Sequence, residues 1–249
     1  MTEQASIGVG RYGLCAGCPY TDSHLSHDRC KPGDSCVRAH SGRQIDRFFR
    51  ANKDQAEHFL ADLFWERRAI AARYAPIELI GHLVNDNDEI VRRVVVDRIP
   101  ADILVRMISD PDREVRLGVA ARIPEEHLHR MLHDPDYLIR ATVARRLPHG
   151  QLARMAKDSE REVRKVVAAR LPAFALDMLV TDPEPEVRAI VAERALPGLA
   201  ATLLGDSEWW VRLAAVGNAP LEELPPLTSD PESEVREAAL ARLTEENAN

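Results

Sequence analysis

An aspartate that recurs every 24 residues constrains this chain more than any other feature of its sequence. Seven segments align at that spacing without a gap, and they begin at Asp86, Asp110, Asp134, Asp158, Asp182, Asp206 and Asp230. A repeat this short cannot bury an apolar face by itself, so consecutive copies have to stack on one another. The sequence therefore predicts an all-α solenoid of 24-residue repeats.

Each repeat carries the signals of a helix between its aspartate and a proline. In one repeat we expect Asp110 to be the N-cap, Pro111 to take the first helical position and Asp112 to lie in the positive end of the helix dipole. The helix should end near Arg122, because Pro124 cannot extend the hydrogen-bond ladder. Its apolar face consists of Val115, Val119 and Ile123, widened by Ala120.

A second, shorter helix is expected in the linking segment, residues 123–134. A proline opens this segment, and its apolar residues Leu128, Met131 and Leu132 follow a helical spacing. About nine residues of 3₁₀ helix at ~2.0 Å each match twelve residues of α-helix at ~1.5 Å, although a short α-helix also fits. A weaker eighth repeat over residues 55–78 keeps Asp62, Arg68 and Pro76, with Arg67 in an apolar position.

All four cysteines lie near the amino end, at Cys15, Cys18, Cys30 and Cys36. A C-x-x-C pair presents two thiolates to a soft metal, and two further cysteines complete a four-sulfur set. Disulfides are disfavoured in the reducing compartment that we expect for this chain. The spacing leaves zinc and an iron-sulfur cluster as alternatives, since both accept four thiolates.

Other polar residues surround these cysteines in the sequence. A histidine could replace a thiolate, but with four cysteines available His24, His27 and His40 are interpreted as bystanders or as groups that orient the ligands. The basic residues nearby could offset the charge of a metal centre, or could simply be solvated. These basic residues are Arg11, Arg29, Lys31 and Arg38.

The repeat pattern resembles a known family. The strings Leu-x-x-Met/Leu, Asp-Pro-x-x-x-Val-Arg and Ala-Arg-x-Pro look like the leucine-rich repeat variant family, over most of the chain. The resemblance implies a right-handed superhelix that alternates α and 3₁₀ helices without strands, and a [4Fe-4S] cluster on the four cysteines. The sequence departs from the pattern at Ala195–Pro197, Asn218 and Thr244.

Two series of arginines follow the repeat. The first could pair with the aspartates to link adjacent repeats, or could line a groove for an acidic peptide or a nucleic-acid backbone. These residues are Arg92, Arg116, Arg140, Arg164, Arg188, Arg212 and Arg236. The second series is expected to stabilise terminal helix carbonyls. It consists of Arg98, Arg122, Arg146, Arg170 and Arg194.

Aromatic residues gather at two places. Trp209 and Trp210 are adjacent near a helix start, where they could pack against a neighbouring loop or contact a partner. A second group is expected to form the core that joins the cysteine region to the first repeats. It consists of Phe48, Phe49, Phe59, Phe64, Trp65 and Tyr74.

Composition limits the function classes. The net charge of −7 and the excess of acidic residues after residue 54 argue against non-specific nucleic-acid binding. No targeting signal, membrane span, catalytic motif or small-molecule site is evident, which indicates a cytoplasmic protein that is not an enzyme.

We expect an iron-sulfur cluster domain over residues 1–54 and about eight repeats over 55–249. The leading hypothesis is a scaffold that binds a protein partner under redox or iron control. The alternatives are an electron-transfer protein and a nucleic-acid-binding protein.

Overall fold

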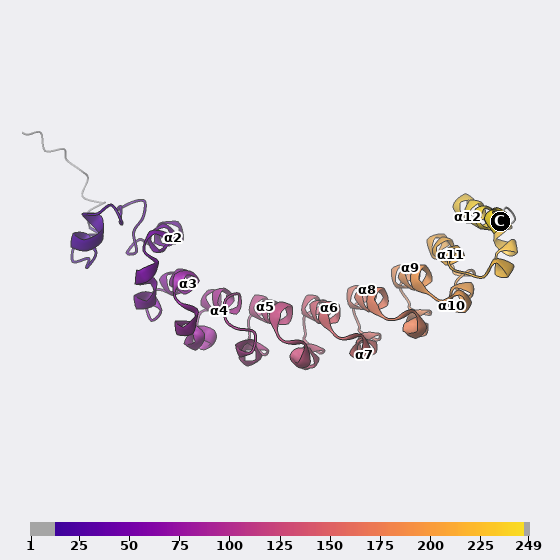
Figure 1. The fold of residues 1–249 in the computed structure, drawn as a ribbon, viewed down its shortest axis with the longest axis horizontal. Coiled ribbons are helices and arrows are strands. Elements are labelled where there is room, and N and C mark those ends of the chain that lie inside the picture. The colour runs from indigo at the N-terminus through magenta and orange to yellow at the C-terminus, as the bar shows by residue number, and fades with distance from the viewer. Residues whose placement is uncertain (1–12, 247–249) are drawn as a thin grey trace, which may run out of the picture. The chain divides into compact units, whose positions relative to one another are not determined.

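Helices make up most of the part that the computed structural model describes, residues 13–246 (Figure 1). The α-helices are α2 (Gly42–Ala51), α3 (Trp65–Tyr74), α4 (Glu89–Val96), α5 (Arg113–Arg122), α6 (Tyr137–Arg146), α7 (His149–Leu152), α8 (Arg161–Arg170), α9 (Pro185–Arg194), α10 (Pro197–Thr202), α11 (Trp209–Val216) and α12 (Ser233–Glu246). Residues 13–246 contain no β-strand beyond one isolated bridge between Lys31 and Ser35. The all-α prediction is confirmed.

Shorter helical segments alternate with the long α-helices. A π-helical turn spans Thr21–Leu25, and 3₁₀ segments span Lys53–Phe59, Ile77–Leu79, Gly81–Asn85, Ile103–Met107, Glu125–Met131, Ala153–Met155, Ala173–Leu179, Leu221–Glu223 and Pro225–Ser229. The linking segments are thus mostly 3₁₀, whereas α7 and α10 are short α-helices. Both conformations expected for the linking segments occur.

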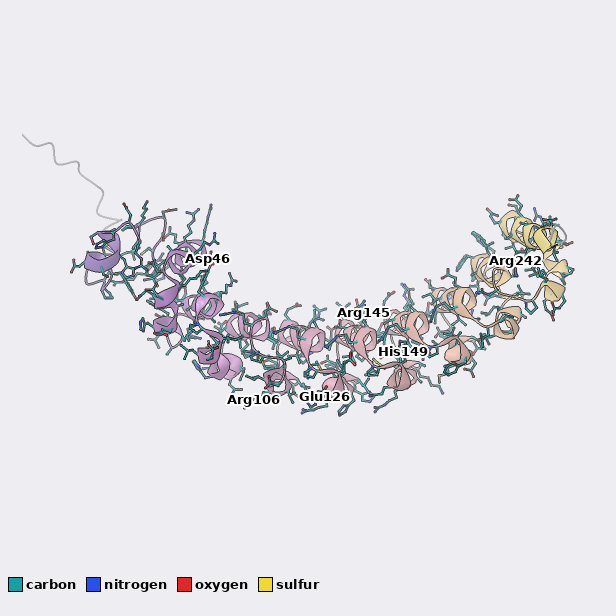
Figure 2. All side chains as sticks on the ribbon, viewed as in Figure 1. Asp46, Arg106, Glu126, Arg145, His149 and Arg242 are labelled. Carbon is teal, nitrogen blue, oxygen red and sulfur yellow. The ribbon has the colours of Figure 1, made fainter. Side chains whose placement is uncertain are left out.

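The chain divides into two compact units, Met1–Ile123 and Pro124–Asn249. Within each unit the long α-helices form one layer and the short segments form a second layer (Figure 1). In the second unit, Arg145 lies on the α-helical layer and Glu126 on the 3₁₀ layer (Figure 2). This alternation confirms the repeat solenoid.

The start of the repeat helix differs from the expectation. Helix α5 begins at Arg113, and its N-cap is Asp112, whose Oδ1 accepts the Val115 N–H at 3.0 Å. Asp110 was expected to be the N-cap and Pro111 the first helical residue, and both predictions are wrong. The Asp110 carboxylate instead accepts the Asp112 N–H at 2.9 Å, which holds a turn ahead of the helix. The predicted end at Arg122 is confirmed.

The predicted apolar stripe forms the core between repeats. The side chains of Val115, Val119, Ala120 and Ile123 are fully buried. Leu128 in the linking segment is fully buried as well, and Met131 and Leu132 are nearly so. At ~25 cal/mol per Å² of apolar surface, this repeated burial is the main stabilising contribution of the fold.

The first arginine series forms a ladder between adjacent repeats. In six pairs, an arginine donates from Nε and Nη2 to both carboxylate oxygens of the aspartate 18 residues later. Within the two compact units the pairs are Arg68–Asp86, Arg92–Asp110, Arg140–Asp158, Arg164–Asp182, Arg188–Asp206 and Arg212–Asp230. The predicted Asp–Arg ladder is confirmed, and Arg68 shows that the divergent eighth repeat takes part in it.

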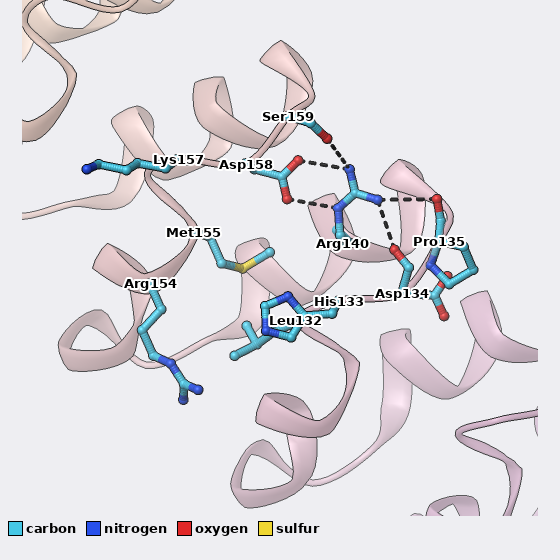
Figure 3. Close-up of a pocket in the computed structure, with 10 residues that line it drawn as sticks. All are labelled: Leu132, His133, Asp134, Pro135, Arg140, Arg154, Met155, Lys157, Asp158 and Ser159. Atoms are coloured by element: carbon cyan, nitrogen blue, oxygen red, sulfur yellow. Dashed lines mark hydrogen bonds and ion pairs between the residues drawn. The ribbon is translucent and has the colours of Figure 1, made fainter.

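Figure 3 shows one rung of this ladder in the second compact unit. Arg140 donates from Nε and Nη2 to Asp158 at 2.8 and 2.9 Å, and from Nη1 to the carbonyls of Asp134 and Pro135 at 2.8 and 3.3 Å. A surface notch of about 430 Å³ lies beside it, lined also by Arg154 and Lys157. All three nitrogens of the Arg140 guanidinium therefore donate hydrogen bonds to groups of its own repeat or the next one.

The second arginine series points in the opposite direction along the chain. Arg170 donates from Nη1 to the carbonyls of Ala144 and Leu147 at 2.6 and 2.9 Å, at the end of the preceding repeat's helix. Arg98, Arg122, Arg194 and Arg242 also donate to carbonyls at or just after the end of the preceding helix. These carbonyls have no partner within their own helix, so each arginine serves as a C-cap supplied by the next repeat.

The departures from the repeat pattern have small structural effects. Asn218 still donates from Nδ2 to the Ala192 carbonyl at 3.0 Å, which preserves one hydrogen bond of the arginine that it replaces. Thr244 stands where other repeats have a proline, and α12 continues past it to Glu246. At Ala195–Pro197 the shifted proline opens α10 in place of a 3₁₀ segment.

Candidate functional site

The first two cysteines lie on one tight turn. The Cys18 N–H donates to the Cys15 carbonyl at 3.0 Å, and Gly17 has φ of 63°, a conformation that favours glycine. The Thr21 hydroxyl donates to the carbonyls of Cys15 and Cys18 at 3.2 and 3.0 Å. The C-x-x-C string is thus shaped into a turn that presents both thiols.

The other two cysteines flank a second turn. Lys31 and Ser35 exchange two backbone hydrogen bonds, of 2.7 and 2.8 Å, between Cys30 and Cys36. Within the turn, Gly33 has φ of 85°. The Cys36 N–H donates to the Gln44 carbonyl at 3.1 Å, which attaches this turn to α2.

The four thiols are unpaired and lie on or beside these two turns. All four are free, with Cys30 and Cys36 buried and Cys15 and Cys18 half-buried. Burial, which is the largest cause, and the neighbouring negative charges of Cys36, Cys18 and Cys15 together raise the pKa of Cys30 to about 12. Burial also raises the pKa of Cys15, followed by Cys36 and Cys18, whereas Arg38 lowers it. The thiols therefore lie within electrostatic reach of one another.

The donor set fits an iron-sulfur cluster. Within residues 13–246, no three His, Cys, Asp or Glu side chains are arranged to hold a single metal ion. A four-iron cluster takes one thiolate on each iron, and a zinc site of this kind takes four thiolates on one ion. Four soft thiols with no carboxylate among them suit such a cluster.

The neighbouring histidines differ in their surroundings. His24 is buried, with its ring centroid 4.7 Å from that of Tyr20 and 6.0 Å from that of Phe48. Burial lowers its pKa, followed by the Arg29 charge, and its Nε2 has no hydrogen-bond partner. His27 is exposed, and the exposed His40 lies edge-on to an aromatic ring.

The neighbouring cations are placed differently from one another. Arg38 donates to the Ala16 carbonyl at 2.7 Å, beside the C-x-x-C turn. Arg29 pairs with Asp54 at 3.0 Å, while the nearest carboxylate oxygen to Lys31 is 3.9 Å away. Arg38 is therefore the cation that acts on a cysteine, and Arg11 lies outside the described residues.

Sequence reasoning missed Asn52, which anchors the residue before Cys30. This side chain is fully buried, and its Nδ2 donates to the carbonyls of Arg29 and Phe48, each at 2.8 Å. It stands directly after α2, where a polar residue is also expected simply to cap the helix. Its role depends on a contact 23 residues away, which no local signal in the sequence reveals.

The aromatic core at the junction is smaller than predicted. Phe48 and Phe49 are fully buried, and Phe49 contacts Phe59 and Tyr74 at centroid distances of 5.3 and 6.5 Å. The prediction is wrong for Trp65, which is 38% exposed because it lies at the first position of α3. Tyr20, which the prediction left out, contributes a contact with Phe48 at 5.3 Å.

The comparisons with known proteins agree with both parts of the chain. The family model described as "LRV protein FeS4 cluster" matches residues 9–58, and the model described as "Leucine rich repeat variant" matches residues 113–136. A solved structure described as "a leucine-rich repeat variant with a novel repetitive protein structural motif" is 52% identical, with a TM-score of 0.85. The alignment covers 92% of this chain and 98% of that one. The chain belongs to the leucine-rich repeat variant family.

A curated relative of this leucine-rich repeat variant protein comes from Rhodobacter capsulatus. It is described as "Uncharacterized 27.7 kDa protein in nifB 3'region" and is 40% identical over 85 residues, 34% of each chain. The match thus spans about a third of that relative's length.

None of the described helices combines the length and apolar character that crossing a membrane requires.

The ladder arginines of this leucine-rich repeat variant have their donors occupied by neighbouring repeats and backbone carbonyls. In the six ladder pairs the arginine side chains are between 9% and 15% exposed, and each is bonded to a carboxylate and to backbone carbonyls. For five members of the predicted row, the hypothesis that they present donors to an acidic peptide or nucleic acid is therefore wrong: Arg92, Arg140, Arg164, Arg188 and Arg212. The positive charge of each arginine is paired with an aspartate of the next repeat.

The two adjacent tryptophans lie at the start of α11. Their ring centroids are 6.0 Å apart, and the rings meet edge to face. Trp209 is half-buried, whereas 38% of Trp210 is exposed. The exposed indole is therefore available to solvent or to a partner.

Proposed function

We propose that this protein is a repeat scaffold for a protein partner and that its amino-terminal region binds a [4Fe-4S] cluster. The proposed ligands are Cys15, Cys18, Cys30 and Cys36. The proposed domains are the cluster domain, residues 1–54, and the repeat domain, residues 55–249. The observation that carries the proposal is that four free thiols lie on two adjoining turns, with Cys15 and Cys30 within electrostatic reach of the other cysteines, in a segment matched by an iron-sulfur family model.

The chemistry of the thiols sets conditions on loading. A bound cluster supplies a redox-active centre whose integrity depends on iron and on oxidants. Ligation requires thiolates, and burial together with its neighbours holds the Cys30 thiol in the protonated form at neutral pH. Cluster loading therefore releases thiol protons, because each sulfur exchanges its proton for a bond to iron.

The cysteine segment is connected directly to the helices that begin the repeats. The Cys36 N–H bonds to a carbonyl of α2, and Asn52 bonds the backbone before Cys30 to the end of the same helix. Helix α2 packs against α3, the α-helix of the first repeat. Ligation at four points would hold this segment on α2, so the state of the cluster bears on the first repeat.

The proposed activity is binding, with no catalytic step. A solenoid offers a long surface to a macromolecule and needs a cover at its end. The proposed setting is the cytoplasm, where thiols stay reduced. In this proposal the repeats bind the protein partner, and the cluster region covers the end of the repeats. Because the cluster is sensitive to oxidants and iron, partner binding comes under redox or iron control.

Limited proteolysis tests this coupling. Anaerobically loaded protein and the same protein stripped of iron by a chelator are digested side by side. We expect cuts between residues 40 and 75 to become faster on stripping, because α2 loses its tie. Cys36→Ser should give the stripped pattern from the start, and Ser35→Ala should behave as the unaltered protein. An unchanged pattern in this region on stripping would reject the coupling.

A further inference from the structure

Charge is distributed unevenly along the repeats. Residues 171–249 hold fifteen Asp and Glu against five Arg, with no Lys and no His. Residues 124–170, in the same compact unit, hold ten Lys and Arg against seven Asp and Glu. The carboxyl-terminal repeats are therefore the strongly acidic part of the molecule.

The few arginines in this acidic part form hydrogen bonds within the repeat domain itself. Arg188 and Arg212 bond the ladder aspartates, and Arg194 and Arg242 bond carbonyls of the preceding helix. Arg236 donates to the carbonyls of Asp230 and Pro231 at 2.6 and 2.9 Å. The glutamates that project from the α-helices are thus left without a cation from their own repeats.

The exposed tryptophan lies among these glutamates. Glu186 and Glu234 stand 24 residues before and after Trp210, at the same position on α9 and α12, and both helices pack against α11. Both glutamates are exposed. Arg161 approaches Glu186 at 3.6 Å, but its side chain is 53% exposed and such surface pairs are weak. Carboxylates therefore flank the indole on both sides.

The start of α11 adds a further carboxylate. Glu208 occupies the N-cap position but makes no side-chain cap hydrogen bond, unlike Asp112 at the same position of α5. It directly precedes Trp209 in the chain. We name the surface formed by Glu186, Glu208, Trp209, Trp210 and Glu234 the tryptophan face.

We infer that the tryptophan face docks an extended segment of a protein partner that is rich in arginine and lysine. Indole faces attract cations, and carboxylates accept paired hydrogen bonds from a guanidinium. The same carboxylates repel a nucleic-acid backbone and would have to be desolvated against an apolar partner. Charge complementarity therefore selects a basic segment. This inference rests on the proposed scaffold function, and it names the chemistry of the partner.

A peptide-binding measurement tests the inference on the loaded full-length chain. The probe is a fluorescein-labelled decapeptide of alternating arginine and glycine, followed by fluorescence anisotropy. We expect Trp210→Ala and the double variant Glu186→Gln/Glu234→Gln each to weaken binding by about tenfold or more. The matched control Glu222→Gln/Glu223→Gln makes the same charge change on the 3₁₀ segment Leu221–Glu223 and should weaken binding less than about twofold.

Two results would overturn the inference. Equal weakening by the two double variants would mean that net charge alone attracts the peptide. Equal binding of a peptide with glutamate in place of arginine would mean that the surface does not select cations. Circular dichroism of each variant confirms its fold, and the glutamate variants carry the test if Trp210→Ala unfolds.

The inference and the proposed function fail separately. Protection of residues 40–75 by the cluster without peptide binding would refute the basic partner and keep the cluster-coupled scaffold. Peptide binding by a chain whose proteolysis ignores the cluster would keep the tryptophan face and refute the coupling.

Discussion

Arg164 donates from Nε and Nη2 to the two carboxylate oxygens of Asp182, at 2.7 and 3.0 Å, and joins one repeat to the next. The two side chains are 9% and 3% exposed, so water screens the pair little. The remaining nitrogen donates to the carbonyls of Asp158 and Ser159. One guanidinium thus satisfies groups in two adjacent repeats, which makes the ladder a directional bond between neighbours.

Removing this arginine should destabilise the repeat domain strongly. Arg164→Ala leaves a buried carboxylate without its cation, and we expect the free energy of unfolding to fall by about 3–5 kcal/mol. The matched control is Lys165→Ala, which removes a surface pair with Glu162 and should change it by less than about 0.5 kcal/mol. Urea denaturation followed by circular dichroism measures both. Similar stabilities for the two variants would contradict a structural role for the ladder.

Restoring the missing arginine of the second series should stabilise the protein. Asn218 bonds one carbonyl of the preceding helix, whereas Arg170 bonds two at the equivalent place. We expect Asn218→Arg to raise the free energy of unfolding by about 0.5–1.5 kcal/mol, and Asn218→Ala to lower it by a similar amount. Thermal unfolding of the three proteins checks this order. The account would be wrong if Asn218→Ala were as stable as the natural chain.

The Arg93–Asp112 pair should make stability depend on acid. The hydrogen bond from Arg93 lowers the pKa of Asp112 from its ordinary 3.8 to about 2. The unfolded chain therefore takes up this proton first, so the stabilisation is complete above about pH 4 and is lost as the pH falls through 2.

Asp112→Asn isolates this effect, because asparagine can still cap α5. We expect the unaltered protein to exceed the variant in stability at pH 6 by at most about 1 kcal/mol, since Arg93 is 38% exposed. The difference should shrink between pH 4 and pH 2. Urea denaturation at pH 6, 4 and 2 measures it, and a constant difference across these pH values would speak against the assigned pKa.

Much of the fold was predictable, because the information in a repeat is local and occurs many times. Val115, Val119 and Ile123 follow one helix face, and the sequence shows seven copies of that face. The helix start was less predictable. Asp110 and Asp112 both suit a cap, and only the contact of Asp110 with Arg92 in the preceding repeat decides between them.

The sequence also did not reveal which neighbouring repeat each helix-end arginine contacts. A period of 24 assigns Arg122 to a helix end without saying which repeat supplies its acceptors, and these acceptors belong to the preceding helix. The cysteine spacing predicted a four-sulfur set. The dependence of that set on Asn52 required the folded contact between the end of α2 and the backbone before Cys30.

Asn52 should control how long the cysteine segment holds its cofactor. Asn52→Ala removes two hydrogen bonds of a buried side chain and should lower the local stability by about 2 kcal/mol. We expect faster release of iron to a chelator. Gln55→Ala, which affects only an exposed contact with Asp54, is the control. If Asn52→Ala released iron at the same rate as the control, Asn52 would have no role in holding the cofactor.

Iron, acid-labile sulfide and zinc in anaerobically purified protein test the central claim most directly. The account predicts about four iron and four sulfide per chain with little zinc, and loss of the iron in Cys30→Ser. One zinc per chain without sulfide would contradict it.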